Sequence, residues 1–291
     1  MIRTLLFSSM LALCMSTGIT SAPAQNISDW TEPFPPHKVA GNLYYVGSKG
    51  LASYLITTPE GHILINSSLE ESVSMIRASV EKLGFKFSDV KILLISHAHW
   101  DHCAGSAEIK KVTGCEYMVM EQDTDNVESG GAPRSRLRPA YLTFPATEVD
   151  RVLKDGDEVK LGGTTMVAHL TPGHTQGCTT WTLQVEENGK KLNAVIIGSP
   201  NVNPGYILVN NKEYPGIATD YEKTFRVLKQ LPMDLFLGAH GSYYDMESKF
   251  KLLGANAANP FIDPEGYKRY VEDREQAFLK EWEKQKARPN P

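Results

Sequence analysis

The chain has 291 residues, 41% of them hydrophobic, and a formal net charge of −4. That is enough apolar sequence to bury one substantial core, so one compact catalytic domain is the economical interpretation. Lysine and arginine are scattered rather than gathered in a basic stripe, which argues against a nucleic-acid partner and leaves a small, neutral or anionic substrate open.

The N-terminal residues have the pattern of a secretory signal. Arg3 precedes an apolar run that is too short for a stable membrane span, and Ala22 and Ala24 form an Ala-x-Ala cleavage site. We therefore predict a signal peptide at 1–24, a catalytic domain at 25–291 beginning with Gln25, and a periplasmic location. A buried N-terminal helix is the structural alternative. Lipidation at Cys14 is a minor one, because the bulky Leu13 stands where a small residue is normally needed.

Three cysteines follow the predicted cleavage site: Cys103, Cys115 and Cys178. An odd number allows at most one disulfide and leaves at least one thiol free, and the sequence does not say which pair would join. None of the three lies in a CxxC pair, so a structural zinc site of the finger type is not expected.

The first half of the domain predicts a β-meander followed by alternating helices and strands. Strands are expected at 42–46, 51–58, 62–65, 90–95 and 117–120, with helices at 69–83, 104–112 and 122–128. The apolar strand 90–95 runs directly into Ser-His-Ala-His, where functional groups of α/β proteins often lie. Residues 130–145 predict a long surface loop, whose Arg134, Arg136 and Arg138 either border a cleft or are simply solvated.

The second half repeats this alternation. Strands are expected at 158–161, 164–170, 179–185, 192–197 and 235–237, and helices at 219–231 and 264–286. Layered packing of two such halves predicts two sheets face to face with helices on the outside.

A histidine cluster dominates the sequence. Three of the eight histidines fall between 97 and 102, in His97-Ala98-His99-Trp100-Asp101-His102. Zinc favours imidazole nitrogen and carboxylate oxygen, and a catalytic zinc site keeps one position open for water. A core or surface cluster without a metal would gather several titratable rings with no compensation. The cluster therefore predicts a metal site.

Two further histidines follow apolar strands and adjoin glycines: His174 in Gly173-His174-Thr175 and His240 in Gly238-Ala239-His240. Either alone would be an ordinary turn histidine, but together with the cluster they become candidate ligands. His37, His62 and His169 lie in a Pro-rich leader, a turn and a strand interior, and we interpret them as structural.

These motifs, in this order along the chain, resemble the metallo-β-lactamase superfamily and are most similar to its subclass B3. The resemblance implies an α+β fold, the four-layer αββα sandwich, with two Zn²⁺ ions. It implies that His97, His99 and His174 hold the first zinc and that Asp101, His102 and His240 hold the second.

Within the superfamily the most informative position is Ser199, which follows the strand 192–197. Relatives that hydrolyse thioesters or lactones usually carry a metal-bridging Asp there, whereas a serine hydroxyl is a weak metal ligand. Ser199 therefore favours subclass B3, where this serine contacts substrate, and Asn201 either adds an amide contact or belongs to a turn. Asn66 stands where many relatives have an Asp that steadies the metal loop, so support of that loop is left open.

Three neighbours of the proposed ligands are interpreted as structural. Cys103 and Cys178 are expected to be buried at the start of a helix and of a strand rather than on a metal. Trp100 is expected to pack within its loop rather than to form a substrate platform.

The predicted function is hydrolysis of a small-molecule β-lactam by a monomer, with a zinc-bound hydroxide, oriented by the catalytic Asp101, attacking the lactam carbonyl. Because a fold does not fix its substrate, two alternatives stay open. One is another exported zinc hydrolase, a lactonase or thioesterase, and the other is a non-enzymatic zinc-binding protein.

Overall fold

The computed structural model describes residues 27–131, 143–255 and 258–287. The predicted signal peptide, Cys14, and the three arginines of the 130–145 loop lie outside these ranges. No helix within the described ranges is both long enough and apolar enough to cross a membrane.

Seven strands of the described residues form the first sheet, in the order in which they occur along the chain. They are β1 (His37–Ala40), β2 (Leu43–Tyr45), β3 (Tyr54–Thr58), β4 (Gly61–Ile65), β5 (Val90–Leu94), β6 (Glu116–Met120) and β7 (Arg151–Leu153). β1 to β4 are antiparallel, as the predicted meander requires, and β4 to β7 are parallel. The short edge strands β1 and β7 were not predicted.

The second sheet of the described residues has the order β12-β11-β10-β9-β8. Its strands are β8 (Glu158–Leu161), β9 (Thr164–Leu170), β10 (Thr179–Glu187), β11 (Lys190–Ile197) and β12 (Leu235–Gly238). β8 to β11 are antiparallel neighbours, and β12 joins β11 in parallel. All five were predicted to within a few residues.

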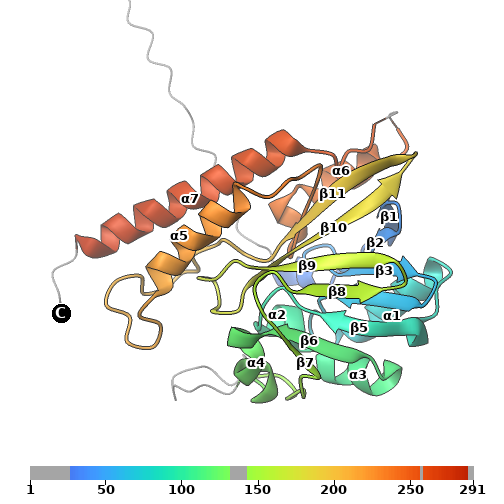
Figure 1. The fold of residues 1–291 in the computed structure, drawn as a ribbon, viewed down its shortest axis with the longest axis horizontal. Helices are drawn as coiled ribbons and strands as arrows, with labels where there is room; N and C mark the ends of the chain where they lie inside the picture. Colours follow the sequence, from blue (N-terminus) through green and yellow to red (C-terminus); the bar gives the residue numbers. More distant parts are fainter. Residues whose placement is uncertain (1–26, 132–142, 256–257, 288–291) are drawn as a thin grey trace, which may run out of the picture.

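Helices flank the two sheets (Figure 1), which confirms the αββα sandwich. On the side of the first sheet lie α1 (Ser72–Lys82), α3 (Ser106–Thr113) and α4 (Glu121–Glu128), and on the side of the second lie α5 (Ile217–Leu228) and α7 (Pro264–Lys286). Short helices are α2 (Trp100–Cys103) and α6 (Met246–Leu252), with 3-10 turns η1 (Ile27–Trp30), η2 (Phe87–Asp89) and η4 (Gly241–Tyr243).

The alternation of side chains along β3 shows why the layers form. Successive residues of a strand point to opposite faces of its sheet. Tyr54 and Ile56 enter the core that also contains Trp181 of the second sheet, whereas Leu55 packs in the outer core with Ile76 of α1. The first sheet is thus apolar on both faces, so it must be covered on both.

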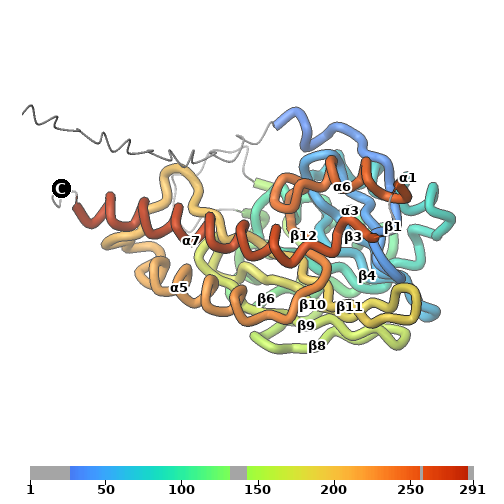
Figure 2. Tube along the Cα trace, turned by 90° about the horizontal axis from the view of Figure 1, so that it is seen from above, coloured from blue at the N-terminus to red at the C-terminus, as the bar shows by residue number. Residues whose placement is uncertain are grey.

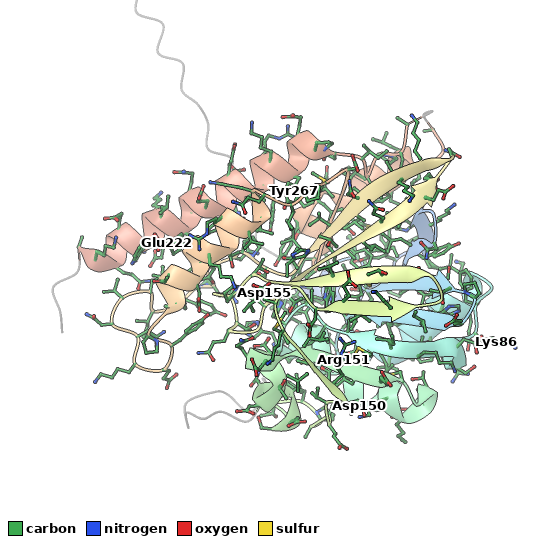
Figure 3. The ribbon with its side chains drawn as sticks, in the orientation of Figure 1. Lys86, Asp150, Arg151, Asp155, Glu222 and Tyr267 are labelled. Atoms are coloured by element: carbon green, nitrogen blue, oxygen red, sulfur yellow. The ribbon has the colours of Figure 1, made fainter. Side chains whose placement is uncertain are left out.

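The long helix α7 lies beside α5, as the views in Figures 1 and 2 both show. Asp263 caps its N-terminus by accepting a hydrogen bond from the Gly266 amide at 2.8 Å. Tyr267, labelled in Figure 3, donates its hydroxyl to the carbonyl of Leu228 at 2.7 Å and packs against Phe236 of β12. These contacts fix α7 to both α5 and the second sheet.

Two predictions about local structure need correction. Cys103 does not begin a helix. It is the last residue of α2, and Ala104 and Gly105 separate it from α3, which begins at Ser106. His37 does not lie in the Pro-rich leader: it begins β1, where it pairs with Tyr45. Cys103, Cys115 and Cys178 are all free, buried thiols, which answers the open question of a disulfide.

Candidate metal centre

The proposed ligands lie at or just beyond the carboxyl ends of strands, with Asp101 and His102 in the short helix α2. His97 follows β5, His174 follows β9 and His240 follows β12. These ends meet at one edge of the sandwich, where the two sheets are joined by hydrogen bonds. The Thr179 amide donates to the Ser96 carbonyl at 2.7 Å, and Trp181 Nε1 donates to the Ile95 carbonyl at 3.0 Å.

The first group of donor atoms consists of three imidazoles. His97, His99 and His174 each offer a ring nitrogen, and these nitrogens lie within 4.8 Å of one another. His99 Nδ1 is 3.2 Å from His174 Nε2. The spacing suits three nitrogens around one ion, so the structure brings together the residues predicted for the first zinc.

The second group adds a carboxylate. His97, Asp101 and His102 also offer ligand atoms within 4.8 Å of one another. One Asp101 carboxylate oxygen, Oδ2, lies 3.1 Å from His102 Nε2 and 3.5 Å from His240 Nε2, and those two nitrogens are 3.1 Å apart. All six predicted ligands therefore converge on one small volume.

The donor set fits zinc. His97 is buried, yet neither of its ring nitrogens has a hydrogen-bond partner among the described residues. Burying an unsatisfied polar group costs free energy, and a bound cation would remove that cost. Imidazole nitrogens with one carboxylate are the ligands that zinc prefers, and the superfamily fold implies the same metal.

The protonation states also suit a metal. Burial lowers the pKa of His97 far below its ordinary value, and it lowers the pKa of His174 to about 4 and of His240 to about 3. Burial alone would raise the pKa of Asp101, but the facing His102 and His240 rings hold it well below its usual range. Neutral imidazoles and an ionised carboxylate are the ligand forms of these residues.

Asn66 supports the loop that carries the cluster, which the sequence had left open. Its backbone is left-handed, with φ 64°, and its side-chain oxygen accepts hydrogen bonds from the Ser96 amide at 2.8 Å and the Ser96 hydroxyl at 3.0 Å. Its amide nitrogen donates to the Ala52 carbonyl at 3.1 Å. Asn66 therefore fixes the residue immediately before His97.

Ser199 and Asn201, the two predicted substrate contacts, are held next to the metal centre by hydrogen bonds to other residues. Ser199 is only 1% exposed, and its hydroxyl lies 3.2 Å from that of Tyr243. The backbone carbonyl of Asn201 accepts a hydrogen bond from His174 Nδ1 at 2.8 Å, and its side-chain oxygen is buried without a partner among the described residues. A role for either side chain in binding substrate stays a prediction.

Two aromatic residues near the centre were not predicted. Tyr206 donates its hydroxyl to the His174 carbonyl at 2.8 Å. Trp30 of η1 lies with its ring centroid 5.5 Å from that of Trp100 and 5.9 Å from that of His240. Trp100 thus packs within a local aromatic group, as expected. Its partner Trp30 lies in η1, where the sequence has no recognisable motif that would have predicted the contact.

Comparison with known proteins gives two kinds of match. The family model for the metallo-beta-lactamase superfamily matches residues 50–187. A hydroxyacylglutathione hydrolase of Rhodopseudomonas palustris is 29% identical over 122 residues, which cover 42% of this chain and only 39% of that protein. The chain thus spans well under half the length of this curated relative.

Solved structures match over nearly their whole length. The native FEZ-1 metallo-beta-lactamase from Legionella gormanii is 53% identical with a TM-score of 0.86, covering 88% of this chain and 98% of that one. BJP-1, a subclass B3 metallo-beta-lactamase of Bradyrhizobium japonicum, is 40% identical with a TM-score of 0.85, covering 90% and 98%. The class B3 di-zinc enzyme LRA-12 from an Alaskan soil metagenome is 34% identical with a TM-score of 0.83, covering 89% and 98%. The chain therefore belongs to the metallo-β-lactamase superfamily, and its structural neighbours are subclass B3 enzymes.

Proposed function

We propose that this superfamily hydrolase is a zinc-dependent β-lactamase that cleaves the amide bond of β-lactam antibiotics. The observation that carries the proposal is the likeness to solved β-lactamases, which at 53% and 40% identity extends over almost the whole of each chain. Ser199 supports it, because an Asp is usual at this position in the thioester- and lactone-hydrolysing relatives.

Two Zn²⁺ ions are proposed, one held by His97, His99 and His174 and the other by Asp101, His102 and His240. Bound zinc supplies Lewis acidity, which lowers the pKa of water and polarises a carbonyl. The protein fixes the geometry: His174 is orientated through its Nδ1 contact with the Asn201 carbonyl. That contact leaves Nε2 directed at the site.

Asp101 is the proposed catalytic residue. Its carboxylate is ionised and lies among the histidines, so it can accept a hydrogen bond from the attacking water and aim the oxygen lone pair at the lactam carbonyl. Hydrolysis adds the water oxygen to that carbonyl carbon and breaks the C–N bond, while the nitrogen gains a proton. The Ser199 hydroxyl and the Asn201 amide are the proposed substrate contacts.

A second candidate is hydrolysis of a lactone or a thioester. The observation that favours it is the partial match to hydroxyacylglutathione hydrolases, at 29% identity over 122 residues. The short matched length makes it the weaker candidate.

The test is hydrolysis of a carbapenem, a lactone and a thioester by protein beginning at Gln25, with and without a chelator. We expect carbapenem hydrolysis that is lost with chelator and in His174→Ala or His240→Ala. His169→Ala is the matched control, because His169 contacts Thr182 on β10 at 2.8 Å instead of the metal centre. Full carbapenem activity in chelator, or cleavage of the lactone or thioester alone, would contradict the proposal.

We also propose that residues 1–24 are a signal peptide, that residues 25–291 are the catalytic domain, and that the chain acts in the periplasm as a monomer. The basic N-terminus, short apolar run and Ala-x-Ala site support export. Cell fractionation with N-terminal sequencing tests the location and the cleavage site. Light scattering of the purified protein tests the oligomeric state.

A further inference from the structure

A buried carboxylate outside the proposed ligand set joins the two loops that carry the three-histidine group. Asp123 lies in the first turn of α4 and is 3% exposed. Its Oδ2 accepts hydrogen bonds from the Ala98 amide and the Thr175 hydroxyl, each at 2.8 Å, and its Oδ1 accepts one from the Gly177 amide at 2.9 Å.

Two of these three donors belong to residues directly next to proposed zinc ligands. Ala98 stands between His97 and His99, and Thr175 directly follows His174. The first loop follows β5 and the second follows β9, so they come from different sheets, which are joined beside these loops by the Thr179 amide donating to the Ser96 carbonyl at 2.7 Å. The Asp123 side chain adds a second connection, which reaches the residues next to the histidines themselves.

The surroundings allow little movement. A Cβ atom added to Gly177 would lie 2.6 Å from Asp123 Cγ, so the second loop closes directly onto the carboxylate. On the same helix, Asn126 Nδ2 donates to the Ala98 carbonyl at 2.5 Å. Both the amide and the carbonyl of Ala98, the residue between His97 and His99, are therefore hydrogen-bonded to side chains of α4.

We propose that Asp123 is a positioning residue, which sets the spacing of His97 and His99 relative to His174 and so holds the three-histidine site ready for zinc. This inference rests on the ligand assignment of the proposed function. Charge-assisted hydrogen bonds are stronger than neutral ones, and removing a buried acceptor leaves its donors unsatisfied. Loss of such outer partners typically weakens metal binding about 10- to 100-fold.

The test measures zinc binding rather than hydrolysis. Asp123→Asn keeps the size of the side chain but turns an NH₂ group toward one set of donors. We expect zinc affinity, measured by competition with a chromophoric chelator, to fall about 10- to 100-fold. The absorption spectrum of the cobalt(II)-substituted protein should also change, because the geometry at the three histidines changes.

Asp234→Asn is the matched control. Asp234 Oδ2 accepts hydrogen bonds from the Asn193 amide at 2.7 Å and from Asn193 Nδ2 at 3.0 Å, just before β12, at the end opposite His240. We expect its zinc affinity to stay within about twofold of the wild type, since it has no contact with a metal loop. An equal loss in both variants, or no loss in Asp123→Asn, would overturn the proposal.

Thr175→Val provides a second variant should Asp123→Asn fail to fold. It removes one of the three donors and keeps the carboxylate, so a smaller loss of zinc affinity is expected, and an unchanged affinity would overturn the proposal. The zinc-affinity and cobalt-spectrum measurements use no β-lactam, so they test the positioning role of Asp123 independently of β-lactam hydrolysis. A wild type that hydrolyses no β-lactam refutes only the proposed function.

Discussion

The ring of Tyr221 packs directly on the backbone of Gly173, so that a Cβ atom built at Gly173 would lie 2.8 Å from the ring's Cγ. The Tyr221 hydroxyl donates to the Asn201 carbonyl at 2.7 Å, and the same carbonyl accepts the hydrogen bond from His174 Nδ1 at 2.8 Å. Tyr221 of α5 thus fixes both the chain that precedes His174 and the acceptor that orientates its ring.

Gly173→Ala should disturb this arrangement. Gly173 has φ 124°, a conformation that side chains rarely adopt, and the added methyl would overlap Tyr221. We expect a loss of about 2–4 kcal/mol in the free energy of unfolding of the zinc-free protein, measured with urea, together with weaker zinc binding.

Gly84→Ala is the control for this prediction. Gly84 also has positive φ, at 89°, but its added Cβ meets nothing within 4 Å. It should lose only about 1 kcal/mol, from backbone strain alone. Equal losses in the two variants would show that contact with Tyr221 contributes nothing.

The sequence was sufficient to bring four of the candidate ligands together, because they follow one apolar strand within six residues and no packing information is needed to place them side by side. Asp123 was not foreseeable in this way. The run Glu121-Gln122-Asp123-Thr124-Asp125 resembles a solvated, acidic helix start, and only the packing of α4 shows that Asp123 points inward.

The edge strand β1 could not be predicted from the sequence either. β1 is four residues long and follows a Pro-rich stretch, so its own sequence has almost no strand period. Its conformation is fixed by pairing with β2, at His37 with Tyr45 for example, which is a tertiary contact. Short segments of this kind depend on their partners more than on local propensity.

Asn66→Ala should destabilise the loop that precedes His97. The change removes the acceptor of the Ser96 amide and hydroxyl and the donor to Ala52, all of them buried. We expect a loss of roughly 2–4 kcal/mol in the free energy of unfolding, because buried partners are left unsatisfied. Asn188→Ala is the control, since Asn188 has φ 53° but is exposed. A loss no larger than that of the control would mean that backbone conformation alone accounts for the effect.

His37→Phe should flatten the dependence of stability on pH. Burial lowers the pKa of His37, against the opposing hydrogen bond to the Pro35 carbonyl, so on acidification the unfolded chain takes up this proton first. The contribution is present above pH about 6.5 and is lost as pH falls below it, at up to about 1.4 kcal/mol per pH unit.

Phenylalanine retains the stacking of this ring on Tyr45 and Phe261 but binds no proton. The measurement is urea unfolding of both zinc-free proteins between pH 7 and pH 5, where the other histidines contribute equally and cancel in the difference. Identical slopes in wild type and variant would contradict the prediction.

Removal of zinc should lower thermal stability even where no substrate is present. His97, at the centre of the six converging side chains, buries two ring nitrogens that the described residues leave unpaired, and a ligand that binds only the folded state stabilises it by mass action. At a free zinc concentration about 100 times Kd this amounts to about 2.7 kcal/mol. A chelator should therefore lower Tm by roughly 5–10 °C in a domain of this size. The same shift is expected in His169→Ala and a much smaller one in His174→Ala. An unchanged Tm in the wild type would mean that the cluster binds no metal.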